Sequence, residues 1–307
     1  MHSILLANSS CHYNELALTL EAAYDDLDYK STTFRPIPCG STKCSAYSGS
    51  GCVGCNAKPS PSCTNNTCGA DGYTPWSDAL YSSGLIHDKI FLYTHSKNLS
   101  KVLQYPMSGF PFACADKGPL KGMSPNAKGI LTLANVNITF HSVVSKTSKV
   151  PHKLALCLRT TDTLINKGLH GALYVGGGPY YMSKESHRDF SKSLVTTPLV
   201  VNPKSTTPIS GESDKSVKYF INVKAPEVGG TPLKIDSSLL TINKNGVGGT
   251  KLSTLDPYTI LHRNIYKALV DVFTAKAKAM NIWYMANTTS GPRVPTIDFV
   301  LNGQNAS

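Results

Sequence analysis

Six cysteines crowd into the short segment between residues 39 and 68. That segment, CGSTKCSAYSGSGCVGCNAKPSPSCTNNTC, is too polar to build a core of its own, so cross-links must hold it in place. Cys52 and Cys55 form a C-x₂-C pair, which can open a zinc site, but no second such pair follows and the next histidine is His87. We therefore expect disulfides, with zinc as the alternative. The cluster consists of Cys39, Cys44, Cys52, Cys55, Cys63 and Cys68.

Other features agree with an extracellular protein. Glycosylation sequons begin at Asn8, Asn65, Asn98, Asn137, Asn287 and Asn305. The first residues, MHSILLANSSCHYNEL, lack the basic and long apolar regions of a signal peptide, so we expect that signal to be missing from this chain. No apolar run approaches the roughly 20 residues needed to cross a bilayer. Cysteines number nine, an odd count, so at least one is expected to lack a partner within the chain.

The chain is basic, with 30 Lys and Arg against 19 Asp and Glu and a formal net charge of +11. A basic protein is attracted to polyanions such as nucleic acid, acidic lipid or acidic polysaccharide. The charge is dispersed, however, without a long Lys/Arg run or a basic helix with interleaved aromatics. We expect a diffusely basic surface and no nucleic-acid site, and an acidic polysaccharide is a candidate partner.

The pattern of apolar residues predicts a mainly β protein. Gly and Pro together number 43, which favours short strands and turns over long helices. Strands are expected within residues 84–95, 129–144, 153–158, 171–181 and 218–235, with turns at residues 228–230 and 245–246. One helix is expected over residues 264–280, capped by Asn264. Its apolar stripe consists of Ile265, Leu269, Val272, Phe273 and Met280.

A series of short motifs carries a resemblance to a known family. In order they are FACA at 112–115, LALCL at 154–158, LYVGGGPYY at 173–181, TTPLVVNP at 196–203, YFINVK at 219–224, GVGGTKLSTLDPYTIL at 246–261 and VPTIDFVL at 294–301. With the cysteine-rich loop, this order resembles the plant pepsin-like inhibitor family. That family includes xylanase inhibitors, extracellular dermal glycoproteins and seed basic globulins. The resemblance covers roughly residues 31–301 and is most specific from 171 to 261.

The resemblance implies a mainly β, bilobal pepsin-like (acid protease) fold. We expect an N-terminal lobe at residues 1–193, which carries the cysteine-rich loop, and a C-terminal lobe at 194–307. It also implies secretion, disulfides in the first lobe, and function by binding rather than hydrolysis. Compared with the family, we expect the fold to be incomplete at its N- and C-terminal ends. No cofactor and no metal are implied.

The chemistry of the family's proteases can be tested against the residues. A pepsin-like protease needs one aspartate from each lobe, on an Asp-Thr/Ser-Gly turn, and the two carboxylates share one proton. Neither Asp-Thr-Gly nor Asp-Ser-Gly occurs in this chain. In the stretch GGTKLSTLDPYT, Ser253 takes the place of the second-lobe aspartate, and Thr254 and Leu255 follow it. A serine hydroxyl cannot hold the shared charge, so we expect no catalytic residue and an inactive homologue.

Two alternatives would restore catalysis. Asp256 lies three residues after Ser253, but it precedes Pro257 as an ordinary turn residue does. Ser253 with His262 as its base would be a nucleophile, but no G-x-S-x-G elbow surrounds it.

The first-lobe catalytic strand is not recognisable. Cys11 is a candidate relic of the cysteine that follows it in the family. Asp25, Asp26 and Asp28 are interpreted as solvated charges rather than catalytic groups.

These observations predict a secreted, non-catalytic glycoprotein of the plant cell wall. Its expected partner is a microbial glycoside hydrolase or another wall ligand, an acidic wall polysaccharide among them. Ser253, Thr254, Leu255 and Tyr258 are the candidate contact residues of the former cleft. The alternatives are an aspartic endopeptidase and a storage or structural glycoprotein.

Overall fold

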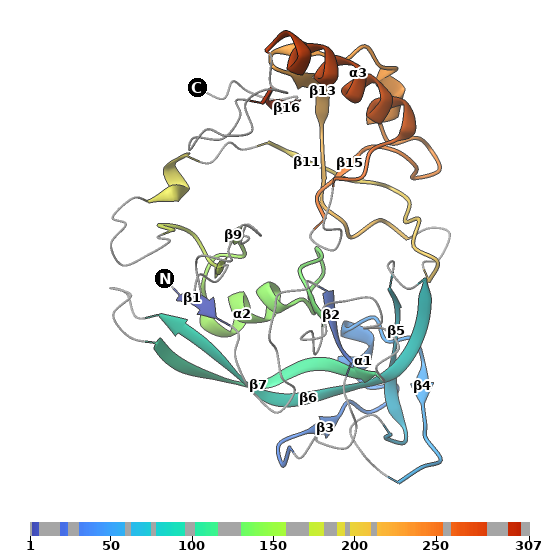
Figure 1. Ribbon diagram of the computed structural model, residues 1–307. Coiled ribbons are helices and arrows are strands. Elements are labelled where there is room, and N and C mark those ends of the chain that lie inside the picture. Colours follow the sequence, from blue (N-terminus) through green and yellow to red (C-terminus); the bar gives the residue numbers. More distant parts are fainter. Residues whose placement is uncertain are drawn as a thin grey trace. The chain divides into compact units, whose positions relative to one another are not determined.

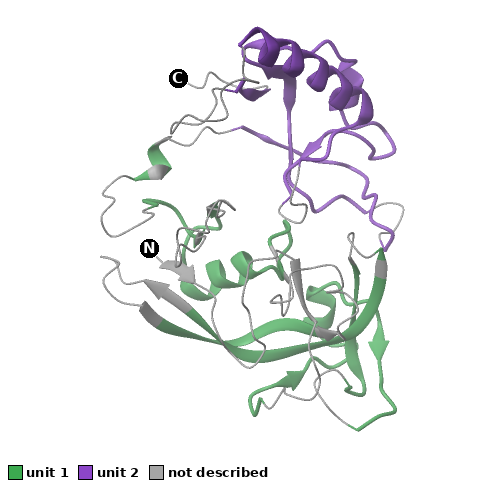
Figure 2. Ribbon diagram, viewed as in Figure 1, with its two compact units in different colours: residues 1–194 green, residues 195–307 purple. Residues whose placement is uncertain are grey.

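The computed structural model describes residues 2–5, 19–23, 31–58, 63–74, 78–95, 102–115, 130–157, 172–180, 189–193, 197–209, 214–253, 259–280 and 294–301. The chain forms two compact units, Met1–Leu194 and Val195–Ser307, which Figure 2 shows in different colours. Strands dominate unit 1, as the sequence predicts, and unit 2 combines short strands with one long helix (Figure 1). None of the described helices is long and apolar enough to span a membrane.

Unit 1 is built on a ten-stranded sheet with the order β8-β2-β7-β6-β1-β10-β9. Beside this path, β3 and β5 pair with β6, and β4 pairs with β5. The strands are β1 (His2–Leu5), β2 (Thr19–Ala23), β3 (Arg35–Pro36), β4 (Cys52–Val53), β5 (Thr67–Thr74), β6 (Ala79–His95), β7 (Val102–Ala115), β8 (Ile130–Thr132), β9 (Leu154–Cys157) and β10 (Ala172–Val175). The strand predicted at 84–95 is confirmed as part of β6. The strands predicted within 153–158 and 171–181 are confirmed as β9 and β10, which pair antiparallel.

The antiparallel hairpin of β6 and β7 supplies half of the buried residues of the main core cluster of unit 1. Its register runs from the pair Leu85–Ala113 to the pair His95–Val102, with an irregularity between Asp88 and Ile90. Apolar side chains of both strands are almost fully buried in one cluster. They are Ile86, Leu92, Met107, Phe110 and Phe112.

The segment 129–144 corrects one prediction. Only Ile130–Thr132 is a strand, and the chain then forms the helix α2 (Phe140–Ser148). The β-branched residues of the segment favour strands, but Phe140 and Val144 lie four residues apart and so share one helical face. Both pack into the core cluster beside Phe110, and Figure 1 shows α2 over the β6–β7 hairpin. Tertiary packing therefore overrides the local preference.

Unit 2 contains two three-stranded sheets and one long helix. The first sheet has the order β11-β12-β15, and the second has the order β14-β13-β16. The elements are β11 (Leu199–Val200), β12 (Phe220–Ile221), β13 (Val223–Val228), β14 (Thr231–Pro232), β15 (Thr250–Lys251), β16 (Ile297–Leu301) and the helix α3 (Arg263–Ala279). Short 3₁₀ helices lie at Ser237–Leu240 in this unit and at Phe190–Ser193 in unit 1. The turn predicted at 228–230 is confirmed between β13 and β14.

The helix predicted at 264–280 is confirmed, with two corrections. The N-cap is His262, whose Nδ1 accepts a hydrogen bond from the backbone N–H of Asn264 at 3.3 Å, so Asn264 is not the cap. Met280 lies beyond the last turn and is 45% exposed, so it does not belong to the buried stripe. The rest of the stripe packs against Val228 and Leu233, and Figure 1 shows α3 beside β13.

A histidine pair on and beside α2 makes unit 1 sensitive to acid. His141 is 2% exposed, and its ring stacks on that of the exposed His152 with centroids 4.8 Å apart. Its Nδ1 has no hydrogen-bond partner among the described residues. Burial, and secondarily the charge of His152, lowers the pKa of His141 from 6.5 to about 4. The folded protein therefore holds this ring neutral where the unfolded chain would protonate it.

We predict that the free energy of unfolding falls as the pH drops from 6.5 towards 4. The unfolded chain takes up a proton at His141 in this window and the folded protein does not, which costs about 3 kcal/mol when complete. The His141→Leu variant lacks this titration and should lose less stability over the same range. Denaturant unfolding at several pH values measures the difference.

The matched control is His152→Gln, which removes the neighbouring charge but leaves His141 buried. Because burial is the larger cause of the shift, this variant should keep most of the pH dependence. Equal losses of stability in His141→Leu and the natural chain would contradict the assignment.

Candidate functional site

The candidate site is the turn of unit 2 at residues 246–253, where the sequence places the lost catalytic position. The strand β15 pairs antiparallel with β12, so that Thr250 lies opposite Ile221 and Lys251 opposite Phe220. The backbone N–H of Leu252 then donates to the carbonyl oxygen of Tyr219 at 2.9 Å. Ser253 follows directly and is exposed at the surface.

Hydrogen bonds between side chains and the backbone hold residues 243–247, which precede Ser253 in the turn. The Oδ1 atom of Asn243 accepts from the N–H groups of Asn245 and Val247 at 2.9 and 3.1 Å. The buried Asn202 donates from Nδ2 to the carbonyl oxygen of Gly246 at 2.8 Å. The turn predicted at Asn245-Gly246 is therefore confirmed, and a bridge between Ile242 and Gly248 closes it. These bonds make the loop a rigid platform.

The charge around this turn is positive. Between Asp236 and Asp256 the sequence contains no carboxylate at all. The pKa of Lys218 is lowered by desolvation and, secondarily, by the like charge of Lys251, which places the two ammonium groups near one another. A pair of carboxylates that shares one proton needs acidic groups here. The described part of the turn offers a hydroxyl and lysines instead.

Several predicted site residues lie outside the described residues. They are Thr254, Leu255, Asp256 and Tyr258 in the turn, and Cys11, Asp25, Asp26 and Asp28 in the first unit. Their roles stay predictions. His262, the alternative base, is the N-cap of α3, and its Nδ1 is already bonded to the backbone of Asn264.

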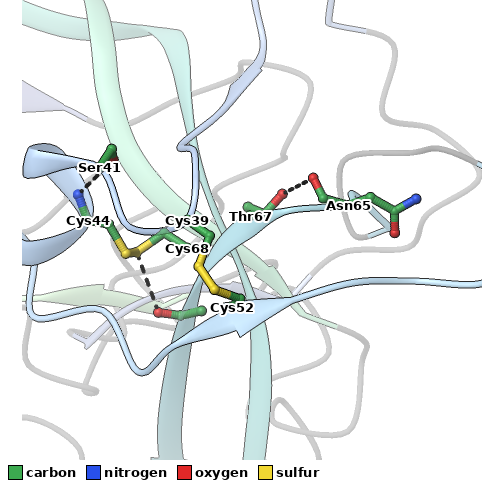
Figure 3. Close-up of a disulfide and its surroundings, with 8 residues drawn as sticks. Cys39, Ser41, Cys44, Cys52, Asn65, Thr67 and Cys68 are labelled. Atoms are coloured by element: carbon green, nitrogen blue, oxygen red, sulfur yellow. Dashed lines mark hydrogen bonds between the residues drawn. A yellow bond between two sulfur atoms is a disulfide. The ribbon is translucent and has the colours of Figure 1, made fainter.

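The cysteine-rich segment is held by three disulfides, Cys39–Cys52, Cys44–Cys68 and Cys55–Cys63. Figure 3 shows the first two beside the short helix α1 (Thr42–Ala46), whose N-cap Ser41 accepts from the N–H of Cys44. Cys52 and Cys55 belong to different disulfides, so the C-x₂-C pair is not a zinc half-site. In the part of the chain that the structure describes, no cluster of His, Cys, Asp and Glu is suited to a metal ion.

The structure describes two of the six predicted glycosylation sequons. Asn65 and Asn137 are both exposed, and the Oδ1 of Asn65 accepts from the N–H of Cys55 at 2.9 Å. The other sequons, Asn8, Asn98, Asn287 and Asn305, lie outside the described residues. The same holds for the side chains of Cys11, Cys114 and Cys157.

Comparison with known families decides the assignment. The sequence pattern of the family described as "Xylanase inhibitor N-terminal" matches residues 10–177, and that of "Xylanase inhibitor C-terminal" matches residues 218–307. The chain belongs to the xylanase-inhibitor family of pepsin-like proteins. The family resemblance inferred from the motifs is thus confirmed.

Comparison with individual proteins also shows sequence similarity over most of this chain. The chain is 33% identical to "Probable aspartic proteinase GIP2" of Nicotiana benthamiana over 91% of its length and 65% of that protein. It is 28% identical to "Gamma conglutin 1" of Prunus dulcis over 90% of its length and 62% of that protein. The chain therefore spans slightly less than two thirds of the curated relatives it matches.

Solved structures of the family establish the fold. The crystal structure of edgp superposes with a TM-score of 0.79 at 30% identity, covering 94% of this chain and 71% of that one. Basic 7S globulin from soybean superposes with a TM-score of 0.69 at 20% identity, covering 93% and 70%. The predicted mainly β, bilobal pepsin-like fold is thereby confirmed. The terms first lobe and second lobe are used below for units 1 and 2.

One prediction tests the rigidity of the turn before Ser253. Gly248 has φ +97°, and a Cβ there would collide with the carbonyl oxygen of Thr241. Gly230 has φ +73°, but a Cβ there would meet nothing within 4 Å. An alanine at either position would adopt an unfavourable positive φ, but only at Gly248 would its Cβ also collide with the backbone. Gly230→Ala should therefore lower the free energy of unfolding by about 1 kcal/mol, and Gly248→Ala by about 2 kcal/mol more. Urea unfolding measures both, and equal losses would show that the turn yields easily.

Proposed function

We propose that this chain is a non-catalytic, pepsin-like secreted glycoprotein that binds a protein partner, a microbial glycoside hydrolase, through the second-lobe turn around Ser253. The observation that carries the proposal is the composition of that turn. Its described part is held by the pairing of β15 with β12, and the family resemblance puts Ser253, close to Lys251, where a protease needs a carboxylate. The scaffold therefore supports binding better than hydrolysis.

Exposed apolar side chains flank the turn and suit a protein interface. Leu252 is 60% exposed on one side of residues 254–258, and Ile260 is 75% exposed on the other. Interfaces use apolar and aromatic anchors at their centre, and Leu255 and Tyr258 lie between these two exposed residues in sequence. We infer that Leu255 and Tyr258 are the anchors and that Ser253 and Thr254 lie beside them.

Secretion to the cell wall is part of the same proposal. Three disulfides in the first lobe favour an oxidising compartment, because thiols stay reduced in the cytosol. Asn65 and Asn137 are exposed and accessible to glycosylation.

Two alternatives draw support from the names of relatives. One relative is named "Probable aspartic proteinase GIP2", which favours an endopeptidase, although no Asp-Thr/Ser-Gly turn occurs in this chain. Another solved relative, conglutin gamma, is described as a globulin from lupine seeds, which favours a storage role. A storage protein needs no saturable partner, and that difference separates it from an inhibitor.

The proposal is tested by measuring saturable binding and inhibition against a panel of microbial glycoside hydrolases, xylanases among them. We expect at least one to be bound, and Leu255→Asp and Tyr258→Ala to weaken its binding at least about tenfold, because central anchors carry most of the energy of an interface. The control is Ile297→Ser, an exposed apolar residue of the other sheet, which should leave affinity unchanged. Absence of saturable binding to every hydrolase would overturn the proposal and favour the storage alternative.

A further inference from the structure

A pocket of about 320 Å³ lies in the first lobe where β3, α1 and the β6–β7 hairpin meet. It is distinct from the second-lobe turn and is lined by Thr33, residues 35–38, Lys43, His87, Asp88 and Gly109. Its charged members are Arg35, Lys43, His87 and Asp88, and its apolar walls include Pro36 and Pro38. The volume falls at the small end of the range for ligand pockets, roughly 300–1,000 Å³, which suits about one or two sugar rings.

The strand register brings two basic residues together. In the antiparallel pair of β3 and β6, Arg35 lies directly opposite His87. Directly opposed side chains have Cβ atoms about 5 Å apart, so these two side chains are close enough to contact one ligand together. Lys43 of α1 lies close enough for its charge to lower the pKa of His87, although burial is the larger cause. The cationic side chains of Arg35 and Lys43 therefore lie at one pocket with the imidazole of His87, whose lowered pKa favours its neutral form.

The one carboxylate of the pocket is already engaged. Asp88 is 5% exposed, and its Oδ1 accepts hydrogen bonds from the hydroxyls of Ser31 and Thr33 and from the N–H of Lys89. Neither Arg35 nor Lys43 forms an ion pair with any residue that the structure describes. The basic side chains thus face the pocket without an acidic partner of their own.

The guanidinium of Arg35 is oriented by its own strand. Its Nη1 donates to the carbonyl oxygens of Phe34 at 2.7 Å and Thr32 at 3.2 Å. The N–H groups on Nη2 and Nε have no partner among the described residues, and they form the planar fork that matches a carboxylate. His87 is similarly oriented, because its Nε2 lies 3.2 Å from the hydroxyl of Tyr47.

Lys43 is positioned by a buried cross-link. It lies next to Cys44 on α1, and the Cys44–Cys68 disulfide ties that helix to β5. Orienting the side chains before a ligand arrives reduces the entropy lost on binding.

We propose that this pocket binds the carboxylate of an acidic sugar, a hexuronate unit of an anionic polysaccharide. Arg35 and Lys43 pair with the carboxylate, and the sugar ring packs against Pro36 and Pro38. An inorganic anion would use the basic groups but leave the apolar walls without a contact, whereas a neutral sugar would leave the basic groups unpaired. The proposal uses residues of the first lobe only, so it stands or fails separately from hydrolase binding.

The test is calorimetric titration of the full chain with digalacturonate at low ionic strength, where exposed charges are least screened. We expect saturable binding that is about tenfold weaker in Arg35→Gln and in Lys43→Gln, the loss of one charge-assisted contact. Lys146→Gln is the matched control, because this exposed lysine of α2 carries the same charge outside the pocket. Its affinity should stay within about twofold of the natural chain.

Comparison of ligands separates the sources of binding. Xylobiose, which has no carboxylate, and inorganic phosphate, which has no ring, should each bind at least about tenfold more weakly than digalacturonate. In NMR spectra, digalacturonate should shift the ring signals of His87 and leave those of His152 in place. Equal weakening by Lys146→Gln, or phosphate or xylobiose binding as tightly as digalacturonate, would overturn the proposal. So would an absence of saturable binding.

Discussion

The Cys44–Cys68 disulfide is the constraint on which the edge of the first lobe depends. Cys44 is 6% exposed and Cys68 is fully buried, and together they form the centre of a small core with Ile37, Leu85 and Ala113. The sequence separation is 24 residues, so in the chain-entropy view the bond contributes about 3.5 kcal/mol. Without it, a segment with few apolar residues would have little to hold it against β5 and β6. The two other disulfides close shorter loops around this anchor.

In the second lobe, hydrogen bonds rather than disulfides hold the turn that precedes Ser253. Buried Asn202, the side chain of Asn243 and the pairing of β12 with β15 hold the turn that leads to Ser253. In a pepsin-like protease such a turn presents a carboxylate at a fixed point. Here the same kind of frame presents a hydroxyl beside lysines and exposed apolar side chains. A rigid loop on a β scaffold is then free to serve as a binding surface.

The features predicted well from sequence are those in which local pattern and tertiary packing agree. β6 and α3 are long, periodic segments, and the glycines of residues 228–230 favour a turn because they adopt positive φ without steric cost. The helix α2 was missed because its β-branched residues favour a strand locally, and only the core around Phe110 explains Phe140. The disulfide pairing was also beyond the sequence, since the spacing of six cysteines allows 15 connectivities.

The two candidate sites also differ in how far the sequence alone could predict them. The assignment of Ser253 to the former catalytic position follows from the family motif and stays a prediction, while the turn at Asn245-Gly246 before it is confirmed. The pocket of Arg35, Lys43 and His87 was not foreseen, because nothing in the sequence pattern brings His87 to the segment that carries Arg35 and Lys43. The register of β3 against β6 brings two of them together, and the fold of α1 adds the third. The one available signal was an arginine directly before two closely spaced prolines in a short strand.

The central claim, that the scaffold acts without catalysis, is tested most directly by proteolysis. The purified chain is incubated with a denatured protein substrate between about pH 3 and 6, beside pepsin and a Ser253→Asp variant. Circular dichroism at each pH verifies that the chain stays folded. The account predicts no cleavage by the natural chain, and none by the variant, because the first-lobe Asp-Thr/Ser-Gly turn is also absent. Cleavage by the folded natural chain that a dyad-directed inhibitor blocks would contradict it and would point to an unrecognised pair of carboxylates that includes Asp256.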